Sequence, residues 1–168
     1  MTDNRVAPPY VADEVGMLRS WLDFHRETLA VKCAGLSERQ LALRPCAPST
    51  LSLLGLVRHM TEVEQHWFHN ILGGEDRPSI YCTEQDRDGD FDLLGSCSAE
   101  EAIARWHAEI DGVRGLYAEL PLEALGRRQR RGADVSLRWI LVHMIEEYAR
   151  HNGHADIIRE RIDGVTGD

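Results

Sequence analysis

Four long segments of this chain carry apolar residues at three- and four-residue steps, the period of an α-helix, and no segment shows the alternation of a strand. The predicted helices run from about Val11 to Ala34, from Thr50 or Ser52 to Leu72, from Ser98 to the residue before Pro121, and from Ser136 to about Ile162. Each apolar stripe has to be buried against another helix. The sequence therefore predicts an all-α fold in which the long helices form a four-helix bundle.

Capping signals support these bounds. Ser98 and Glu101 have the spacing of a capping box, and Gly35 is the expected stop of the first helix. Ser37 and Gln40 show the same capping-box spacing after Gly35. They predict a short additional helix between the first two long ones.

The connection between the second and third long helices, residues 73–98, is long for a bundle, where neighbours are usually joined by about 2 to 8 residues. We expect it to cross one end of the bundle or to help form a lid. Its segment DRDGDFD resembles the start of a calcium loop, but Gly89 is misplaced and Cys97 stands where a bidentate glutamate is needed. We therefore predict a solvated acidic turn, with carboxylates at Asp86, Asp88 and Asp90.

Length and charge restrict the class of protein. The 168 residues are most simply one domain over 1–168, large enough to fold without a structural metal. The net charge of −9 argues against binding to nucleic acid or an anionic membrane, and the basic segment GRRQRRG is expected to be a solvated loop. No apolar run approaches the roughly 18 residues that cross a bilayer. Without a C-x-x-C pair or a signal-peptide pattern, a reduced, cytoplasmic protein is expected.

Two ionisable residues lie on the apolar stripe of the last helix. Glu147 and His151 are four residues apart, and such side chains are rarely buried unless they are paired or bound to a metal. Residues at this spacing have Cβ atoms about 6 Å apart, so both can reach one ion. His59, on the apolar face of the second helix, is the best candidate for a third ligand. The sequence therefore predicts a metal site formed by His59, Glu147 and His151.

Two histidines and one carboxylate leave coordination positions open for water or substrate, as in catalytic zinc sites. Zinc is the favoured metal, and the same ligands also suit Fe(II), Ni(II) or Co(II). Neither H-E-x-x-H nor Glu-x-x-His occurs, which argues against a zinc protease and a di-iron centre. A hydrogen-bonded core histidine is the simpler interpretation of His59 taken alone, but Glu147 and His151 together favour the metal.

The other histidines are weaker candidates. His154, three residues after His151, could replace it as a ligand or support it, and His25 on the first helix could face the cavity as a proton carrier. His154 and His25 are therefore the predicted catalytic residues. Two further histidines, His143 and His66, could extend the site. The other two, His69 and His107, are expected at the surface.

The stretches PSTLSLLGLVRHMTEVEQHWF and SLRWILVHMIEEYARHNGHADIIRERIDG are the most specific part of a family resemblance. From about Val11 to Gly164 the chain resembles the DinB-like superfamily of metal-binding four-helix proteins, and more closely an actinobacterial branch of it. In this superfamily one ligand comes from the second long helix and two, four residues apart, come from the last. His59, Glu147 and His151 match these positions. Many members have histidine where this chain has Glu147, a departure shared with the mycothiol-dependent maleylpyruvate isomerase branch.

The resemblance implies a thiol-dependent enzyme, because members with assigned activities are isomerases and S-transferases that use mycothiol, bacillithiol or glutathione. We expect a metal-dependent transferase or isomerase that acts on a small electrophile, with mycothiol as co-substrate. None of the four cysteines can be placed beside the metal from the sequence. The alternatives are a hydrolase with metal-activated water and a stress-linked protein that binds a metal or small ligand without turnover. The resemblance also implies a possible homodimer, for which Trp21 and Phe68 are candidate exposed aromatic residues.

Overall fold

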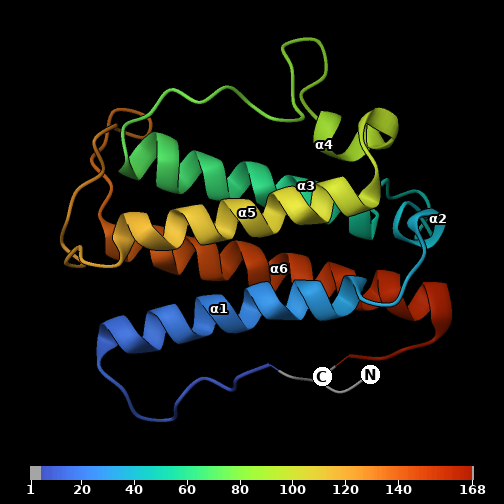
Figure 1. Cartoon of the computed structure of the whole chain (residues 1–168), viewed down its shortest axis with the longest axis horizontal. Coiled ribbons are helices and arrows are strands. Elements are labelled where there is room, and N and C mark those ends of the chain that lie inside the picture. The colour runs from blue at the N-terminus through green and yellow to red at the C-terminus, as the bar shows by residue number, and fades with distance from the viewer. Residues whose placement is uncertain (1–4, 168) are drawn as a thin grey trace.

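The computed structural model describes residues 5–167, and within them the fold is helical, without a β-strand element. Four long helical segments lie side by side (Figure 1). Their bounds are Glu14–Cys33 for α1, Leu53–Glu64 for α3 with its continuation η1 over Gln65–Leu72, Ala99–Tyr117 for α5, and Leu137–Asp163 for α6. The short elements are α2 (Glu38–Leu41), α4 (Gly89–Asp92) and the 3₁₀ turn η2 (Leu94–Ser96). The predicted all-α class is confirmed.

The helix ends follow the capping residues of the sequence. The Ser98 hydroxyl accepts a hydrogen bond from the Glu101 backbone N–H, and the Glu101 carboxylate accepts one from the Ser98 N–H at 2.8 Å. Ser37 and Gln40 form a second capping box at the start of α2. Gly35 follows α1 with a φ of 76°, a left-handed conformation that glycine adopts without steric cost. These predicted starts and stops are confirmed.

The long helices enclose a continuous apolar core. α1 packs along α6, α3 packs along α5, and α3 also contacts α6. The fully buried side chains include Leu22, Leu29, Leu56, Met60, Leu137, Ile140 and Met144. Burial of each such side chain contributes about 1.5 to 3 kcal/mol, so packing of the core holds α3 and α6 in their relative positions.

The second long helix changes its hydrogen-bond pattern at Gln65. η1 is a π-helix, and the Gly73 N–H donates to the Phe68 carbonyl, five residues earlier, at 2.9 Å. This wider turn buries three consecutive residues, Trp67, Phe68 and His69. The sequence predicted a regular helix with Phe68 and His69 exposed. Both placements are wrong, because a π-turn changes which residues face inward.

The long connection runs beside α3 and sets α4 against that helix (Figure 1). Arg58, fully buried on α3, holds this segment by donating to the Gly89 carbonyl at 2.9 Å and to the Ser96 hydroxyl at 3.2 Å. A Cβ atom at Gly89 would lie 2.4 Å from the Tyr81 carbonyl oxygen, so only glycine fits this close approach. The connection thus covers part of α3.

A charged network lies inside the core. Arg26 and Glu64, both fully buried, are joined by two hydrogen bonds of 2.8 and 2.7 Å. The Tyr148 hydroxyl donates to Glu64 at 2.8 Å and accepts from the Trp106 indole at 2.9 Å, while Arg26 also donates to the Tyr117 hydroxyl at 3.1 Å. These residues come from α1, α3, α5 and α6, so one network joins all four long segments. No local pattern in the sequence predicted this network.

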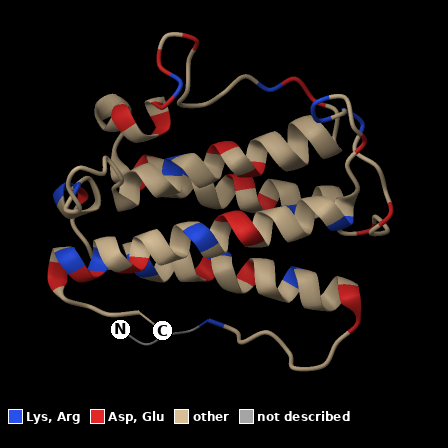
Figure 2. Ribbon diagram, turned by 180° about the vertical axis from the view of Figure 1, so that it is seen from behind, with Lys and Arg blue, Asp and Glu red and all other residues tan. Residues whose placement is uncertain are grey.

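Charged side chains are mixed over the rest of the molecule. Figure 2 shows acidic and basic residues interspersed along the helices, with several basic residues in the loop between α5 and α6. Residues 127–131 of that loop are all exposed, which confirms the predicted solvation of GRRQRRG. Over residues 5–167, no helix has the length and apolar character needed to cross a membrane.

Candidate metal centre

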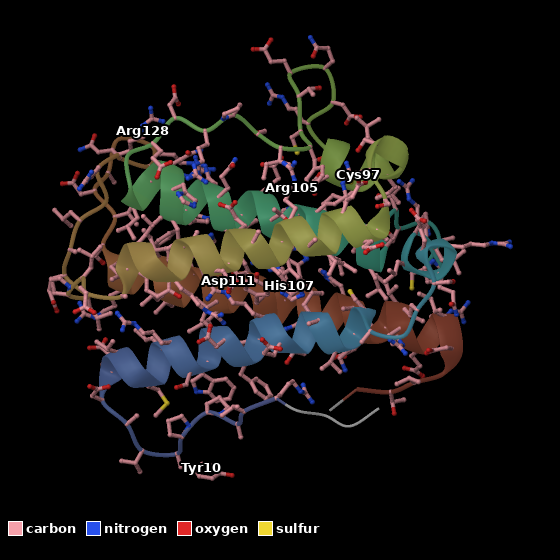
Figure 3. The ribbon with its side chains drawn as sticks, viewed as in Figure 1. Tyr10, Cys97, Arg105, His107, Asp111 and Arg128 are labelled. Carbon is pink, nitrogen blue, oxygen red and sulfur yellow. The ribbon has the colours of Figure 1, made fainter. Side chains whose placement is uncertain are left out.

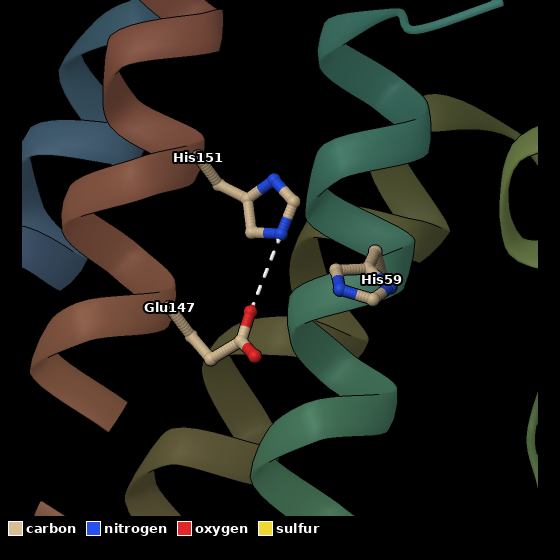
Figure 4. A group of neighbouring side chains, drawn as sticks. All are labelled: His59, Glu147 and His151. Carbon is tan, nitrogen blue, oxygen red and sulfur yellow. Dashed lines mark ion pairs between the residues drawn. The ribbon is translucent and has the colours of Figure 1, made fainter. Parts of the chain in front are cut away.

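His59, Glu147 and His151 converge between α3 and α6. Figure 4 shows Glu147 and His151 one turn apart on α6, with His59 facing them from α3. The Glu147 Oε2 to His151 Nε2 distance is 3.4 Å, and one donor atom from each of the three residues lies within 4.8 Å of the others. The structure therefore brings together the three side chains that the sequence selected as ligands.

A carboxylate from the long connection orients His59. Asp90 lies 2.8 Å from the Nδ1 atom of His59, and the Phe91 ring stacks on the imidazole with centroids 5.2 Å apart. An ionised Asp90 accepts the Nδ1 hydrogen, which leaves the Nε2 lone pair of His59 free to bind a metal. The Asp90 side chain is only 6% exposed, so the prediction that it is solvated is wrong. His59, 31 residues earlier in the chain, gives Asp90 the hydrogen bond that offsets its burial.

His151 is held in its neutral form. Its side chain is 11% exposed, and burial, with smaller effects from His59, His154 and Arg150, lowers the pKa of His151 to about 4. A neutral imidazole is the form that binds metals. The Nδ1 atoms of His151 and His154 are 3.4 Å apart, so His154 can accept a long hydrogen bond from the far side of the ring.

Glu147 also contacts His143, which lies one turn earlier on the same face of α6. Its Oε1 atom lies 3.5 Å from His143 Nε2, whereas its Oε2 atom faces His151. His143, Glu146 and Glu147 form a second group whose donor atoms lie within 4.8 Å of one another. Glu146 is exposed and pairs with Arg150, so this second group is the weaker candidate for a metal.

The residue geometry fits a tetrahedral divalent ion. Metal–ligand distances of about 2.0 to 2.2 Å place neighbouring donors about 3.4 Å apart. Glu147 and His151 already have this separation, and the other donors, within 4.8 Å, require only small side-chain movements. Two neutral nitrogens and a carboxylate oxygen can hold zinc or a related ion and leave a fourth position for another ligand.

A cavity of about 320 Å³ lies beside His59, between α3, the start of η1 and the connection. Its lining includes Asp90, Trp67 and Cys82. The sequence did not place any cysteine beside the metal, and the structure brings Cys82 into this cavity because the connection folds back over α3. Burial raises the pKa of the Cys82 thiol to about 11, so at neutral pH this thiol is protonated.

The remaining histidines lie in different environments. His25, on α1, contacts Asn152, whose amide donates to the His25 carbonyl at 2.9 Å; no contact among the described residues joins it to His59, Glu147 or His151. His66 lines the cavity, and burial lowers its pKa. His69 is buried between Glu75 and Glu109. His107 is exposed on α5, as predicted (Figure 3).

Comparison with known families matches residues 17–164 to the mycothiol-S-transferase model. The chain belongs to the mycothiol-S-transferase family. This result confirms the predicted relationship to the DinB-like superfamily. No curated protein matches the chain. The region matched to the mycothiol-S-transferase family includes both helices that carry the candidate ligands, α3 and α6.

Asp90 should control metal affinity through its hydrogen bond with His59. Asp90→Asn keeps the size of the side chain but removes the negative charge that fixes the His59 tautomer. We expect metal affinity to fall about 10- to 100-fold, as is usual when such a supporting carboxylate is lost. Competition with a chromogenic chelator measures this change. Asp88→Asn, on an exposed neighbour in the same turn, is the control and should leave affinity unchanged.

The low pKa of His151 should make the stability of the metal-free protein depend on pH. The folded-state pKa of His151 is about 4, below the unfolded value of 6.5, so between these pH values the unfolded chain binds the extra proton. Stability should therefore fall as pH decreases from 6.5 to 4, by on the order of 2 to 3 kcal/mol. Urea unfolding at several pH values measures this, and His151→Gln should flatten the dependence. An equal pH dependence of stability in the parent and His151→Gln proteins would contradict the assignment of the low pKa to His151.

Proposed function

We propose that the protein is a metal-dependent mycothiol S-transferase whose divalent cation, preferably zinc, is held by His59, Glu147 and His151. The observation that carries this proposal is the convergence of their three donor atoms within 4.8 Å, from two helices. The family match over residues 17–164 supports the thiol as co-substrate. We also propose that the chain forms a single domain, a four-helix bundle of the DinB type, since all four long segments share one core.

A bound divalent cation would supply the positive charge that deprotonates a thiol at neutral pH. The protein's own part is to fix the ligands: Asp90 sets the tautomer of His59, and burial keeps His151 neutral. His154 contacts the outer nitrogen of His151, so we assign it a positioning role. The catalytic role predicted for His25 stays a prediction.

The nucleophile is proposed to come from outside the chain. Cys82, the cysteine that lines the cavity, is not part of the His59, Glu147 and His151 donor group, and burial raises the pKa of its thiol to about 11 and that of Cys33 to about 12. Only the thiolate form of a cysteine is a strong nucleophile. A low-molecular-weight thiol is therefore the reactant that the site needs. Its sulfur would bond to an electrophilic carbon as a carbon–halogen bond, an epoxide C–O bond or a C=C π bond breaks; the thiol proton would pass to solvent, and the halide would leave or the opened oxygen or carbon would take up a proton.

A thiol-consumption assay tests the proposal. The zinc-loaded protein is incubated with mycothiol and a panel of alkyl halides, epoxides and unsaturated carbonyl compounds, and the loss of free thiol and the product mass are measured. We expect metal-dependent formation of the thioether or thiol adduct. An isomerised electrophile with mycothiol unchanged would point to isomerase activity instead. Hydrolysis without thiol, or tight metal binding without turnover, would reject the transferase.

A further inference from the structure

The row of residues that includes Glu147 and His151 continues along α6 beyond the candidate metal centre. Trp139, His143, Glu147 and His151 recur at four-residue steps, so they follow one face of the helix. With a rise of 1.5 Å per residue, Trp139 lies about 12 Å along the helix axis from Glu147. Any ligand that contacts both ends of this row must be elongated.

Three rings at the Trp139 end of this row form one aromatic group. The Trp139 and His143 rings stack with centroids 4.9 Å apart and an interplanar angle of 26°. Trp67, from η1, lies 5.0 Å from Trp139 and 4.7 Å from His143. Trp139 nevertheless remains 48% exposed, although tryptophan is usually well buried. We call Trp67, Trp139 and His143 the aromatic platform.

A cationic side chain borders the aromatic platform. The Arg130 guanidinium lies 5.8 Å from the Trp67 ring centroid, and Arg130 is exposed. Arg130 and Trp139 both line a second cavity of about 380 Å³. Asp134 also lines this cavity, but its carboxylate accepts a hydrogen bond from Gln129 at 2.9 Å. Arg128, which belongs to the same loop and is labelled in Figure 3, instead pairs with Asp76 at 2.9 Å.

We propose that the aromatic platform and Arg130 bind the planar, anionic end of an elongated electrophilic substrate, such as a conjugated or aromatic carboxylate. An exposed indole stacks on a flat conjugated ring, and a guanidinium binds a carboxylate with paired hydrogen bonds. His143, 3.5 Å from Glu147, joins the platform to the candidate metal centre, so the other end of the ligand would reach the reacting thiol. This inference rests on the proposed function and adds a substrate class to it.

Binding of two probes of equal shape tests the charge preference. Calorimetry on the metal-free protein compares 2-naphthoate, which is anionic, with 2-naphthamide, which is neutral. We expect naphthoate to bind more tightly than naphthamide. In an NMR titration, naphthoate should also shift the indole N–H resonance of Trp139. Trp139→Ala should weaken naphthoate binding about 3- to 10-fold. Arg130→Gln should weaken it about 2- to 5-fold and leave the amide unaffected.

Two matched variants control this experiment. Trp21→Ala removes a comparably exposed tryptophan from α1, and Arg128→Gln removes one positive charge from the same loop. Both should leave naphthoate affinity unchanged. Equal affinity for the two probes, no binding of either, or no effect of Trp139→Ala would overturn the inference. Because metal is absent, such failure says nothing against the transferase, and a protein that binds naphthoate but transfers no thiol would refute only the proposed function.

Discussion

His59→Ala and His151→Ala proteins are expected to purify folded but without stoichiometric metal, and to consume thiol more than about 100-fold more slowly than the parent protein. Each change removes one of three donors from a site whose supporting residues alone are worth about 10- to 100-fold. Folding should survive, because the packed core already fixes the positions of α3 and α6. Elemental analysis, circular dichroism and the mycothiol assay measure the three effects.

His107→Ala is the matched control, since His107 is exposed on α5 and outside the candidate metal centre. It should keep both metal and activity. Glu147→Gln preserves the size of the third ligand and removes its charge, so it should also lower metal occupancy. Unchanged metal content in His59→Ala and His151→Ala would contradict the proposed centre.

Glu64→Ala is expected to lower the free energy of unfolding by about 3 to 5 kcal/mol. The substitution leaves the buried Arg26 guanidinium with only the half-exposed Asp23 carboxylate and the Tyr148 hydroxyl without its acceptor. Urea denaturation, monitored by circular dichroism, measures the loss. Glu27→Ala, which removes an exposed carboxylate from α1, should change stability by less than about 0.5 kcal/mol.

A double variant separates the cost of an unpaired charge from the value of the pair. Arg26→Met combined with Glu64→Leu replaces both ions by apolar side chains of similar size, and such replacements are often neutral or stabilising. The double variant should therefore recover most of the stability lost in Glu64→Ala. If the double variant were as unstable as Glu64→Ala, the ion pair itself would be needed for the fold.

The sequence predicted the long helices well because the signals that define them are local. Apolar spacing and caps such as Ser98, Ser136 and Gly35 act within a few residues, and all three are at helix ends in the structure. Glu147 and His151 could be paired for the same reason, since their spacing on one helix fixes their separation. His59 required a further assumption about which faces of α3 and α6 meet.

The features that the sequence did not predict depend on contacts between distant segments. Asp90 belongs to an irregular connection, and its burial depends on His59, 31 residues earlier. The π-helix η1 changes the direction of Phe68 and His69 without any break in the apolar pattern. The Arg26–Glu64 pair unites two helices whose relative rotation no local signal determines. An acidic residue next to Phe91 in an unusually long connection was the available sign of Asp90.

We propose that one ion is held by the imidazoles of His59 and His151 and by the Glu147 carboxylate, with a vacant position for a thiol. X-ray absorption spectroscopy of the zinc-loaded protein tests this arrangement. We expect nitrogen and oxygen neighbours at about 2.0 to 2.1 Å, with two imidazole rings and no sulfur, and one sulfur at about 2.3 Å after mycothiol is added. A sulfur neighbour before the thiol is added, or an unchanged spectrum afterwards, would contradict the account.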